Sequence, residues 1–223
     1  MFNPAKLLKN LRMVFIYAAV ALTPMMFLPV TSEALDFNKQ FLLYALTILG
    51  LLAWFGQAMA EKRLDFRTSA VDIPLGLFWL FALVSSIISK DRILSFWGDW
   101  SSLSWGFIPL TFYIIFYFLV SNNLRELKQL KAVAVILGAS ALLSALYFLN
   151  WRFDFIPMKN LGLPAWNTIS GLASLYGIFL DLIIILALAF LIEKKERNWG
   201  ATNIFWVITG VTSLAVVVMI GFK

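Results

Sequence analysis

The hydrophobic positions of this chain fall into seven long apolar stretches separated by short polar segments. Most approach the roughly 20 residues that a membrane-spanning helix needs, and none shows the alternation of a barrel strand. Because a bilayer offers no water to backbone N–H and C=O groups, each stretch should be helical. The pattern predicts an all-α, polytopic membrane protein, residues 1–223 forming one transmembrane domain, with spans at about Met13–Val30, Phe41–Met59, Ile73–Ser89, Phe107–Val120, Ala132–Leu149, Gly171–Ile192 and Ile204–Phe222.

Lysine and arginine are distributed unequally between alternate polar segments. Of the 18 basic residues, 12 fall on the same side of the predicted membrane as the N-terminus and 6 on the other side. Short loops rich in Lys and Arg stay in the cytoplasm. The bias therefore predicts a cytoplasmic N-terminus, with Lys223 on the outer face or at that interface.

Prolines and polar residues indicate where the predicted helices should bend or begin. Pro24 is expected to kink the first span, since proline removes a helix hydrogen bond. Asp72 is placed to cap the third helix, and Pro74 suits its first turn. Leucines at helical spacing in Ser121–Lys131 indicate either a helix on the cytoplasmic surface or the start of the fifth span, and we favour the second.

Composition narrows the chemistry that is open to the chain. Hydrophobic residues make up 61% of it and charged residues 13%, against about 45–50% and about 25% in soluble domains. The formal charge of +6 comes from short loops and not from a soluble basic face, so we expect membrane lipid as a partner and no nucleic acid. The chain has no cysteine and no histidine, and we expect neither a metal ion nor a cofactor.

Asp181 lies near the middle of the sixth predicted span. A carboxylate there costs at least about 2.5–3.5 kcal/mol on insertion scales, so it should face protein or water and not lipid. It could couple transport to an ion or proton gradient, or it could be a hydrogen-bonded acid that holds helices together. Since no second intramembrane charge accompanies it, we favour the structural role.

Aromatic and basic residues gather in the two longer outer segments, 90–106 and 150–170. The tryptophans could stack on sugar rings, or could belong to the aromatic belt of any membrane interface. The basic residues could bind a diphosphate, whose oxyanions suit the guanidinium fork, or could anchor loops to lipid headgroups. We favour the second explanation in both cases. The candidate substrate-binding residues are Arg92, Trp97, Trp100, Arg152, Lys159 and Trp166.

Several short motifs occur in a definite order along the chain. Phe27-Leu28-Pro29 precedes Asp36–Gln40, and Ser69-x-x-Asp72-x-Pro74-Leu75 leads to a serine-containing helix end. Ser95-Phe96-Trp97-Gly98 follows, and Asn167-Thr168-Ile169 comes before the sixth span. Over residues 25–223 these motifs resemble the N-terminal half of the O-antigen ligase/polymerase superfamily of bacterial envelope proteins.

The resemblance implies a metal-independent, inverting glycosyltransferase at the outer face of the bacterial inner membrane, with a polyprenyl-diphosphate-linked glycan as donor. In that family the catalytic Arg and His lie on large outer loops further along the chain. This sequence has no such loop and no histidine, so we assign no catalytic residue and expect the chain alone to be inactive. We also expect it to be the N-terminal part of a longer protein, because residues 219–223 resemble the end of the family's seventh helix.

Two other functions compete with the glycan ligase. A small-solute transporter, or a subunit of one, would use Asp181 on its transport path, although the spans lack convincing inverted repeats. A non-catalytic scaffold in an envelope-assembly complex is the third possibility.

Overall fold

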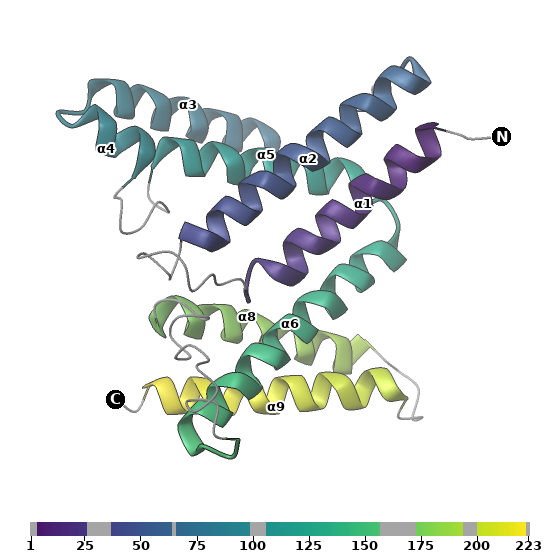
Figure 1. Cartoon of the computed structure of the whole chain (residues 1–223), viewed down its shortest axis with the longest axis vertical. Helices are drawn as coiled ribbons and strands as arrows, with labels where there is room; N and C mark the ends of the chain where they lie inside the picture. Colours follow the sequence, from purple (N-terminus) through teal and green to yellow (C-terminus); the bar gives the residue numbers. More distant parts are fainter. Residues whose placement is uncertain are drawn as a thin grey trace. The chain divides into compact units, whose positions relative to one another are not determined.

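The computed structural model describes residues 4–25, 37–63, 66–98, 106–156, 173–193 and 200–221. Within these residues 87% are helical and no strand occurs, which confirms the all-α class. The described helices follow one another along the chain as α1 (Pro4–Leu22), α2 (Phe37–Glu61), α3 (Asp72–Ile88), α4 (Arg92–Trp97), α5 (Phe107–Asn123), α6 (Leu127–Phe153), α8 (Ala173–Glu193) and α9 (Ala201–Gly221) (Figure 1).

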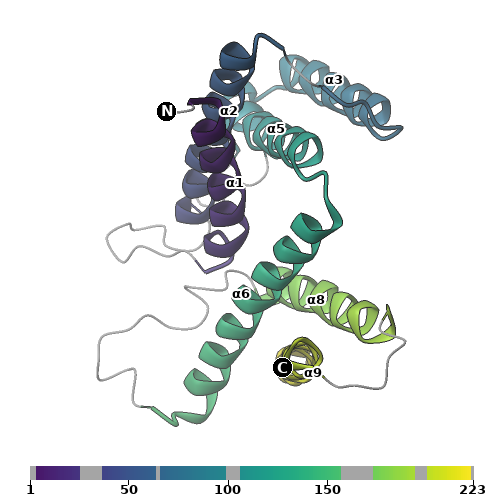
Figure 2. The same cartoon turned by 90° about the vertical axis from the view of Figure 1, so that its right-hand side faces the viewer.

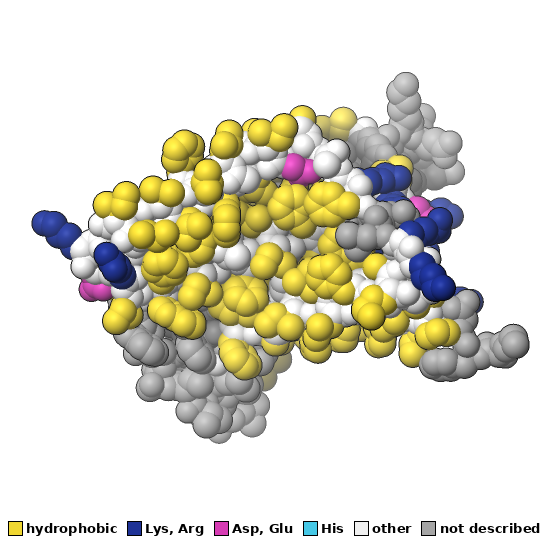
Figure 3. Space-filling view, turned by 90° about the horizontal axis from the view of Figure 1, so that it is seen from above, with side chains coloured by type: hydrophobic (Ala, Val, Ile, Leu, Met, Phe, Trp, Pro, Cys, Tyr) yellow, Lys and Arg dark blue, Asp and Glu magenta, His cyan; other side chains and the backbone are white. Residues whose placement is uncertain are grey.

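The lengths and surfaces of the described helices identify a membrane protein. Four of them, α2, α6, α8 and α9, are long and apolar enough to cross a membrane. The apolar helices α3 and α5 have 17 residues each, at the lower end of the range of about 17–25 for a span. Hydrophobic side chains cover much of the face shown in Figure 3. Large apolar side chains such as Phe81, Ile88 and Ile185 are exposed. Soluble monomers rarely expose such extended apolar surfaces. The chain is therefore an α-helical membrane protein.

Each predicted apolar stretch overlaps one described helix, but α1 differs at both ends. It begins at Pro4 and so includes the charged tail that carries Lys9 and Arg12. It ends at Leu22, and a turn follows at residues 23–25, so the predicted kink at Pro24 is wrong. Proline lacks an N–H and disfavours a helical conformation in the residue before it, which explains why the helix stops there.

The connection between α5 and α6 agrees with the favoured expectation. Helix α6 begins at Leu127, so the second half of Ser121–Lys131 opens the long apolar helix. Gln129 stabilises this start, because its Oε1 accepts hydrogen bonds from the backbone N–H groups of Arg125, at 2.9 Å, and Glu126, at 3.1 Å. A side chain reaching back in this way satisfies donors that a helix N-terminus leaves without intrahelical partners.

The start of α3 corrects one expectation and confirms another. Val71, not Asp72, is the N-cap residue, and no side-chain cap bond forms there. The carboxylate of Asp72 instead accepts hydrogen bonds from the backbone N–H of Ser69, at 2.6 Å, and from the hydroxyl of Tyr117, at 3.1 Å. Pro74 lies in the first turn, as expected. Asp72 thus links the segment before α3 to α5.

The chain packs as two compact units, one drawn from residues 1–19 and 36–130 and the other from 20–35 and 131–223. In the first unit α1, α2 and α5 meet at Ile16, Trp54 and Leu119. Helix α3 lies beside α5 (Figure 2), and the indole N–H of Trp79 donates to Thr111 Oγ1 at 3.0 Å. These contacts fix the helices that line the two cavities described below. The expectation of a single domain stays a prediction.

The second unit is built from α6, α8 and α9. Its core consists of small, branched and aromatic side chains from the three helices, namely Ala141, Ala145, Phe148, Tyr176, Leu180, Ile183 and Val216. The hydroxyls of Ser144 and Tyr176 lie 3.1 Å apart within this core, so two buried polar groups satisfy each other. Small residues on α6 allow neighbouring helices to approach closely, as is common in membrane proteins.

Helix α4 is a short element that the apolar pattern does not predict. Its N-cap is Asp91, whose Oδ1 accepts from the backbone N–H of Leu94 at 3.0 Å. Gly98 ends the helix with φ 82°. Residues that carry a Cβ rarely adopt this left-handed backbone conformation, whereas glycine adopts it readily. Gly106 lies against it, because a Cβ on Gly106 would stand 2.5 Å from the Gly98 nitrogen. Both glycines are therefore required where the chain returns to begin α5.

Candidate functional site

An apolar groove lies in the first unit, between α2, α4 and α5. Its volume is about 490 Å³. The rings of Tyr44 and Phe112 stack on one side of it with centroids 4.2 Å apart. No charged residue lines this groove, which suits a hydrocarbon chain. The lining residues are Phe41, Tyr44, Ala45, Ile48, Trp97, Ile108, Pro109 and Phe112.

Two of the predicted substrate-binding residues, Arg92 and Trp97, lie at opposite ends of α4. Trp97 is 57% exposed and lines the apolar groove. Arg92 is also exposed, and at about 1.5 Å rise per residue it is separated from Trp97 by roughly 7.5 Å along the helix axis. The structure therefore places one predicted aromatic residue at the groove and one predicted cation on the same short helix.

Of the other predicted residues of the outer segments, the structure describes only Arg152. Arg152 is exposed near the end of α6, in the second unit. The turn after it is held by Asn150, whose side chain accepts from the Ile156 N–H at 2.8 Å and donates to the Ile156 carbonyl at 3.1 Å. Three predicted residues, Trp100, Lys159 and Trp166, lie outside the described residues.

Asp181 occupies the exposed side of α8. Its neighbours Ile178, Leu182 and Ile185 are exposed too. Asp181 lines neither the apolar groove nor the second cavity described below. Both the coupling role and the structural role of this carboxylate stay predictions.

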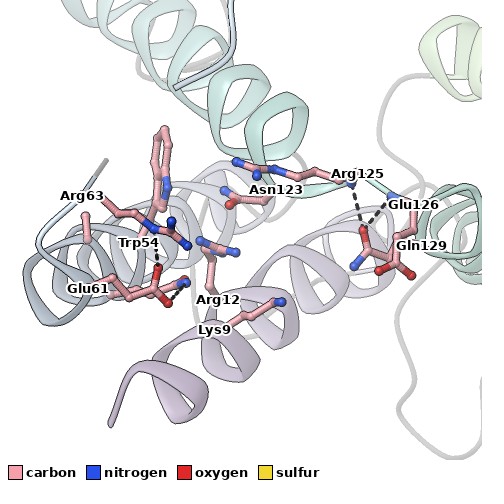
Figure 4. A pocket seen from close by; sticks show the side chains of 11 residues that line it. Lys9, Arg12, Trp54, Glu61, Arg63, Asn123, Arg125, Glu126 and Gln129 are labelled. Atoms are coloured by element: carbon pink, nitrogen blue, oxygen red, sulfur yellow. Dashed lines mark hydrogen bonds and ion pairs between the residues drawn. The ribbon is translucent and has the colours of Figure 1, made fainter. Parts of the chain in front are cut away.

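A second cavity in the same unit is polar and rich in basic side chains, and we call it the basic pocket. Its volume is about 230 Å³. Figure 4 shows side chains from α1, from the end of α2 and from the connection between α5 and α6 that surround it. The basic pocket is lined by Lys9, Arg12, Trp54, Gln57, Ala58, Glu61, Arg63, Asn123, Arg125, Glu126 and Gln129.

Arg12 is the most deeply placed cation of the basic pocket. Its side chain is only 7% exposed, and its Nε has no hydrogen-bond partner. Burial lowers the pKa of Arg12, and the charge of Arg125 lowers it further, while Glu61 acts in the opposite direction. Arginine keeps its proton at any ordinary pH. The fold therefore holds a buried positive charge with an unused donor.

The end of α2 forms one wall of the basic pocket. Glu61 accepts a hydrogen bond from the Gln57 side-chain N–H at 2.8 Å, and its carboxylate lies 3.9 Å from Arg63 Nε. The backbone N–H of Arg63 donates to the Ala58 carbonyl at 3.1 Å, while Lys62 has a φ of 53°. A left-handed residue that turns the chain back on the last helical carbonyls is a common helix end. This turn directs Arg63 toward α1.

The opposite wall comes from the end of α5 and the start of α6. Asn123 is 5% exposed and donates to the Leu119 carbonyl at 2.6 Å, within its own helix. The guanidinium of Arg125 donates through Nε to the Asn122 carbonyl at 3.1 Å. Arg125 is thus anchored at one of its nitrogen atoms beside the pocket.

Sequence reasoning missed the basic pocket because it treated these cations only as markers of membrane topology. The signal was present: three segments expected on the same side of the membrane each supply at least one cation, namely Arg12, Arg63 and Arg125. Only the packing of α1 against α2 and α5 shows that these residues converge. Among the described residues no group of three or more His, Cys, Asp or Glu side chains could hold a metal ion.

No protein-family model matches this chain, and no curated protein or solved structure matches it either. The sequence and the structure establish an α-helical membrane protein with an apolar groove and a basic pocket in one helical unit.

Proposed function

We propose that the chain is an O-antigen ligase/polymerase-like protein of the bacterial inner membrane. In this proposal it crosses the membrane seven times from a cytoplasmic N-terminus. At the outer face it takes part in the transfer of glycan from a polyprenyl diphosphate. The motif resemblance motivates the proposal, and the apolar groove is the observation that supports it best.

The position of the groove along the helices agrees with a substrate held in the outer leaflet. The charge bias puts the first halves of α2 and α5, and the whole of α4, toward the outer face. The groove is lined by these parts, from Phe41 to Ile48, from Ile108 to Phe112, and by Trp97. A hydrocarbon chain seated there would gain about 0.8 kcal/mol for each buried CH₂ group.

Helix α4 supplies the polar complement to this groove. A lipid-linked donor carries a diphosphate directly after its hydrocarbon chain, and a guanidinium is well suited to bind it. Arg92 begins the helix that ends at Trp97, so a cation lies within one and a half helical turns of the apolar lining. The chain thus has the two chemical features that recognition of a polyprenyl diphosphate requires.

The seven-span topology is consistent with the helix lengths. At about 1.5 Å per residue, the 17 residues of α3 and α5 extend roughly 26 Å, which is close to the thinner biological bilayers of about 27 Å. Helices α2, α6, α8 and α9 exceed that length. Helix α1 would supply the remaining span.

The groove can be tested by filling it. Ala45→Phe adds a ring inside the groove, while Ala60→Phe adds the same ring at an exposed position of α2 that does not line it. We expect the protein in lipid nanodiscs to bind radiolabelled polyprenyl diphosphate, and Ala45→Phe to weaken binding at least tenfold. Ala60→Phe should bind like the unmodified chain. Equal binding by all three proteins would contradict a role for the groove.

A further inference from the structure

We infer that the basic pocket binds the phosphate of an inorganic phosphate ion or of a phosphomonoester headgroup. This site shares no residue with the apolar groove and lies toward the opposite end of α2. The inference does not rest on the proposed glycan function, because it follows from the pocket's own charges and unpaired atoms.

The charge of the lining favours an anion. Four cationic side chains, Lys9, Arg12, Arg63 and Arg125, line the pocket together with two carboxylates, Glu61 and Glu126. The lining therefore carries two more positive than negative charges. One of the carboxylates, Glu61, already accepts a hydrogen bond from Gln57 and lies beside Arg63.

Two buried polar atoms of the lining are without a partner. Arg12 Nε is a donor and Gln57 Oε1 is an acceptor, and neither forms a hydrogen bond. A buried polar group that lacks a partner costs about 1–3 kcal/mol, and more if it is charged. A phosphomonoester carries acceptor oxygens and, when singly protonated, an O–H donor. Such a group can therefore partner both atoms.

The backbone N–H groups of Arg125 and Glu126, just before α6, are not available to an anion. Both donate to Gln129 Oε1. The side chains must supply the binding energy, and the guanidinium forks are the groups best suited to phosphate oxygens. Arg12 is fixed by burial and Arg125 by its bond to the Asn122 carbonyl.

The size of the pocket fits a phosphate with part of its hydration shell. Its volume of about 230 Å³ is several times the roughly 30 Å³ that one water molecule occupies in the liquid. Arg63 borders it with a side chain that is 70% exposed, so solvent reaches the rim. A soluble ion can enter from this rim, and a lipid headgroup can enter from a neighbouring leaflet.

Binding can be measured on the purified full chain with two probes. The first is inorganic phosphate, titrated into protein in phosphate-free detergent and followed by calorimetry, with sodium chloride of equal ionic strength as the blank. The second is phosphatidic acid in nanodiscs, compared with phosphatidylglycerol, whose phosphodiester lacks the second ionisable oxygen of a phosphomonoester. A response to the first probe identifies a soluble ligand, and a response to the second alone identifies a headgroup; either supports the inference.

Variants connect the binding to the pocket. We expect Arg12→Gln and Arg63→Gln each to weaken binding of the responding probe at least tenfold. Arg67→Gln removes an exposed arginine that does not line the pocket and should have no effect. Because Arg63 is exposed, its variant tests the site even if Arg12→Gln does not fold. Absence of binding by both probes, or an equal loss in Arg67→Gln, would overturn the inference.

Discussion

Gly138 of α6 lies directly against the indole ring of Trp206 of α9. A Cβ built on Gly138 would stand 2.9 Å from both Cη2 and Cζ3 of that ring. Trp206 is 1% exposed and stacks on Phe190 with centroids 4.7 Å apart, so the ring has little room to move. The contact sets how closely α6 and α9 approach each other within the second unit.

Gly138→Ala is therefore expected to destabilise the protein by about 1–3 kcal/mol, the usual range when a methyl group is forced into a packed core. Gly177→Ala is the matched control, since a Cβ there meets nothing within 4 Å. It should be neutral or slightly stabilising, because alanine favours a helix more than glycine does. Thermal unfolding followed by circular dichroism measures both effects. Equal stability of the two variants would show that the Trp206 ring shifts without a loss of stability.

The hydrogen bond between Tyr117 and Asp72 can be measured with a double-mutant cycle. Tyr117→Phe removes one bond, and Asp72→Ala removes that bond and the one from Ser69. We expect a coupling free energy of about 0.5–1.5 kcal/mol between the two positions, since they are in direct contact. Denaturation in mixed detergent gives the four stabilities. Strict additivity would mean that the bond contributes nothing to the packing of α3 on α5.

The proposed topology can be tested cleanly because the chain has no cysteine of its own. Arg67→Cys and Lys90→Cys place single thiols at exposed positions on either side of α3. A membrane-impermeant maleimide added to intact bacterial spheroplasts should label the second thiol and leave the first unlabelled. After lysis both should react. Labelling of both before lysis, or the reverse pattern, would contradict a cytoplasmic N-terminus.

Asp181→Leu tests what surrounds the exposed side of α8. If the carboxylate faces lipid, the change should favour insertion of this helix by about 2.5–3.5 kcal/mol on insertion scales. A glycosylation-mapping assay in microsomes measures the shift, with Ile178→Leu as a control on the same side. Decreased insertion or stability would instead mean that another protein group holds the carboxylate. A transporter would also lose gradient-driven uptake in Asp181→Asn.

Much of the helical architecture follows directly from the sequence. Apolar runs as long as 132–149 and 204–222 can cross a bilayer only as helices. Helices α6 and α9 contain almost all of these two runs. Helix α4 escaped prediction because its six residues are too few to show a hydrophobic period. It depends on the Asp91 cap and on Gly98 at its end. The end of α1 before Pro24 was missed because a kink and a helix end share the same proline signal.

The cavities depend on tertiary contacts that no local pattern contains. Trp97 stands out in the sequence by its aromatic, outer-segment context, and it lines the groove, but its groove partners Tyr44 and Phe112 lie inside apolar runs and resemble ordinary span residues. Arg12 looked like the last charge before a span. Its burial arises only when α1 packs against α2 and α5, around Ile16, Trp54 and Leu119. Sequence patterns identify surfaces and spans, whereas convergence of distant segments has to be seen in three dimensions.

The contact between Gly98 and Gly106 has a practical consequence for engineering. Because the two residues touch, the ends of the segment between them are held together whatever its length. In general, each doubling of a loop's length adds only about 0.6 kcal/mol to the free energy of closing it. An epitope or a fluorescent reporter inserted between these glycines should leave the flanking helices in place. The segment between the paired glycines is thus a suitable insertion site, beside Trp97 and its groove.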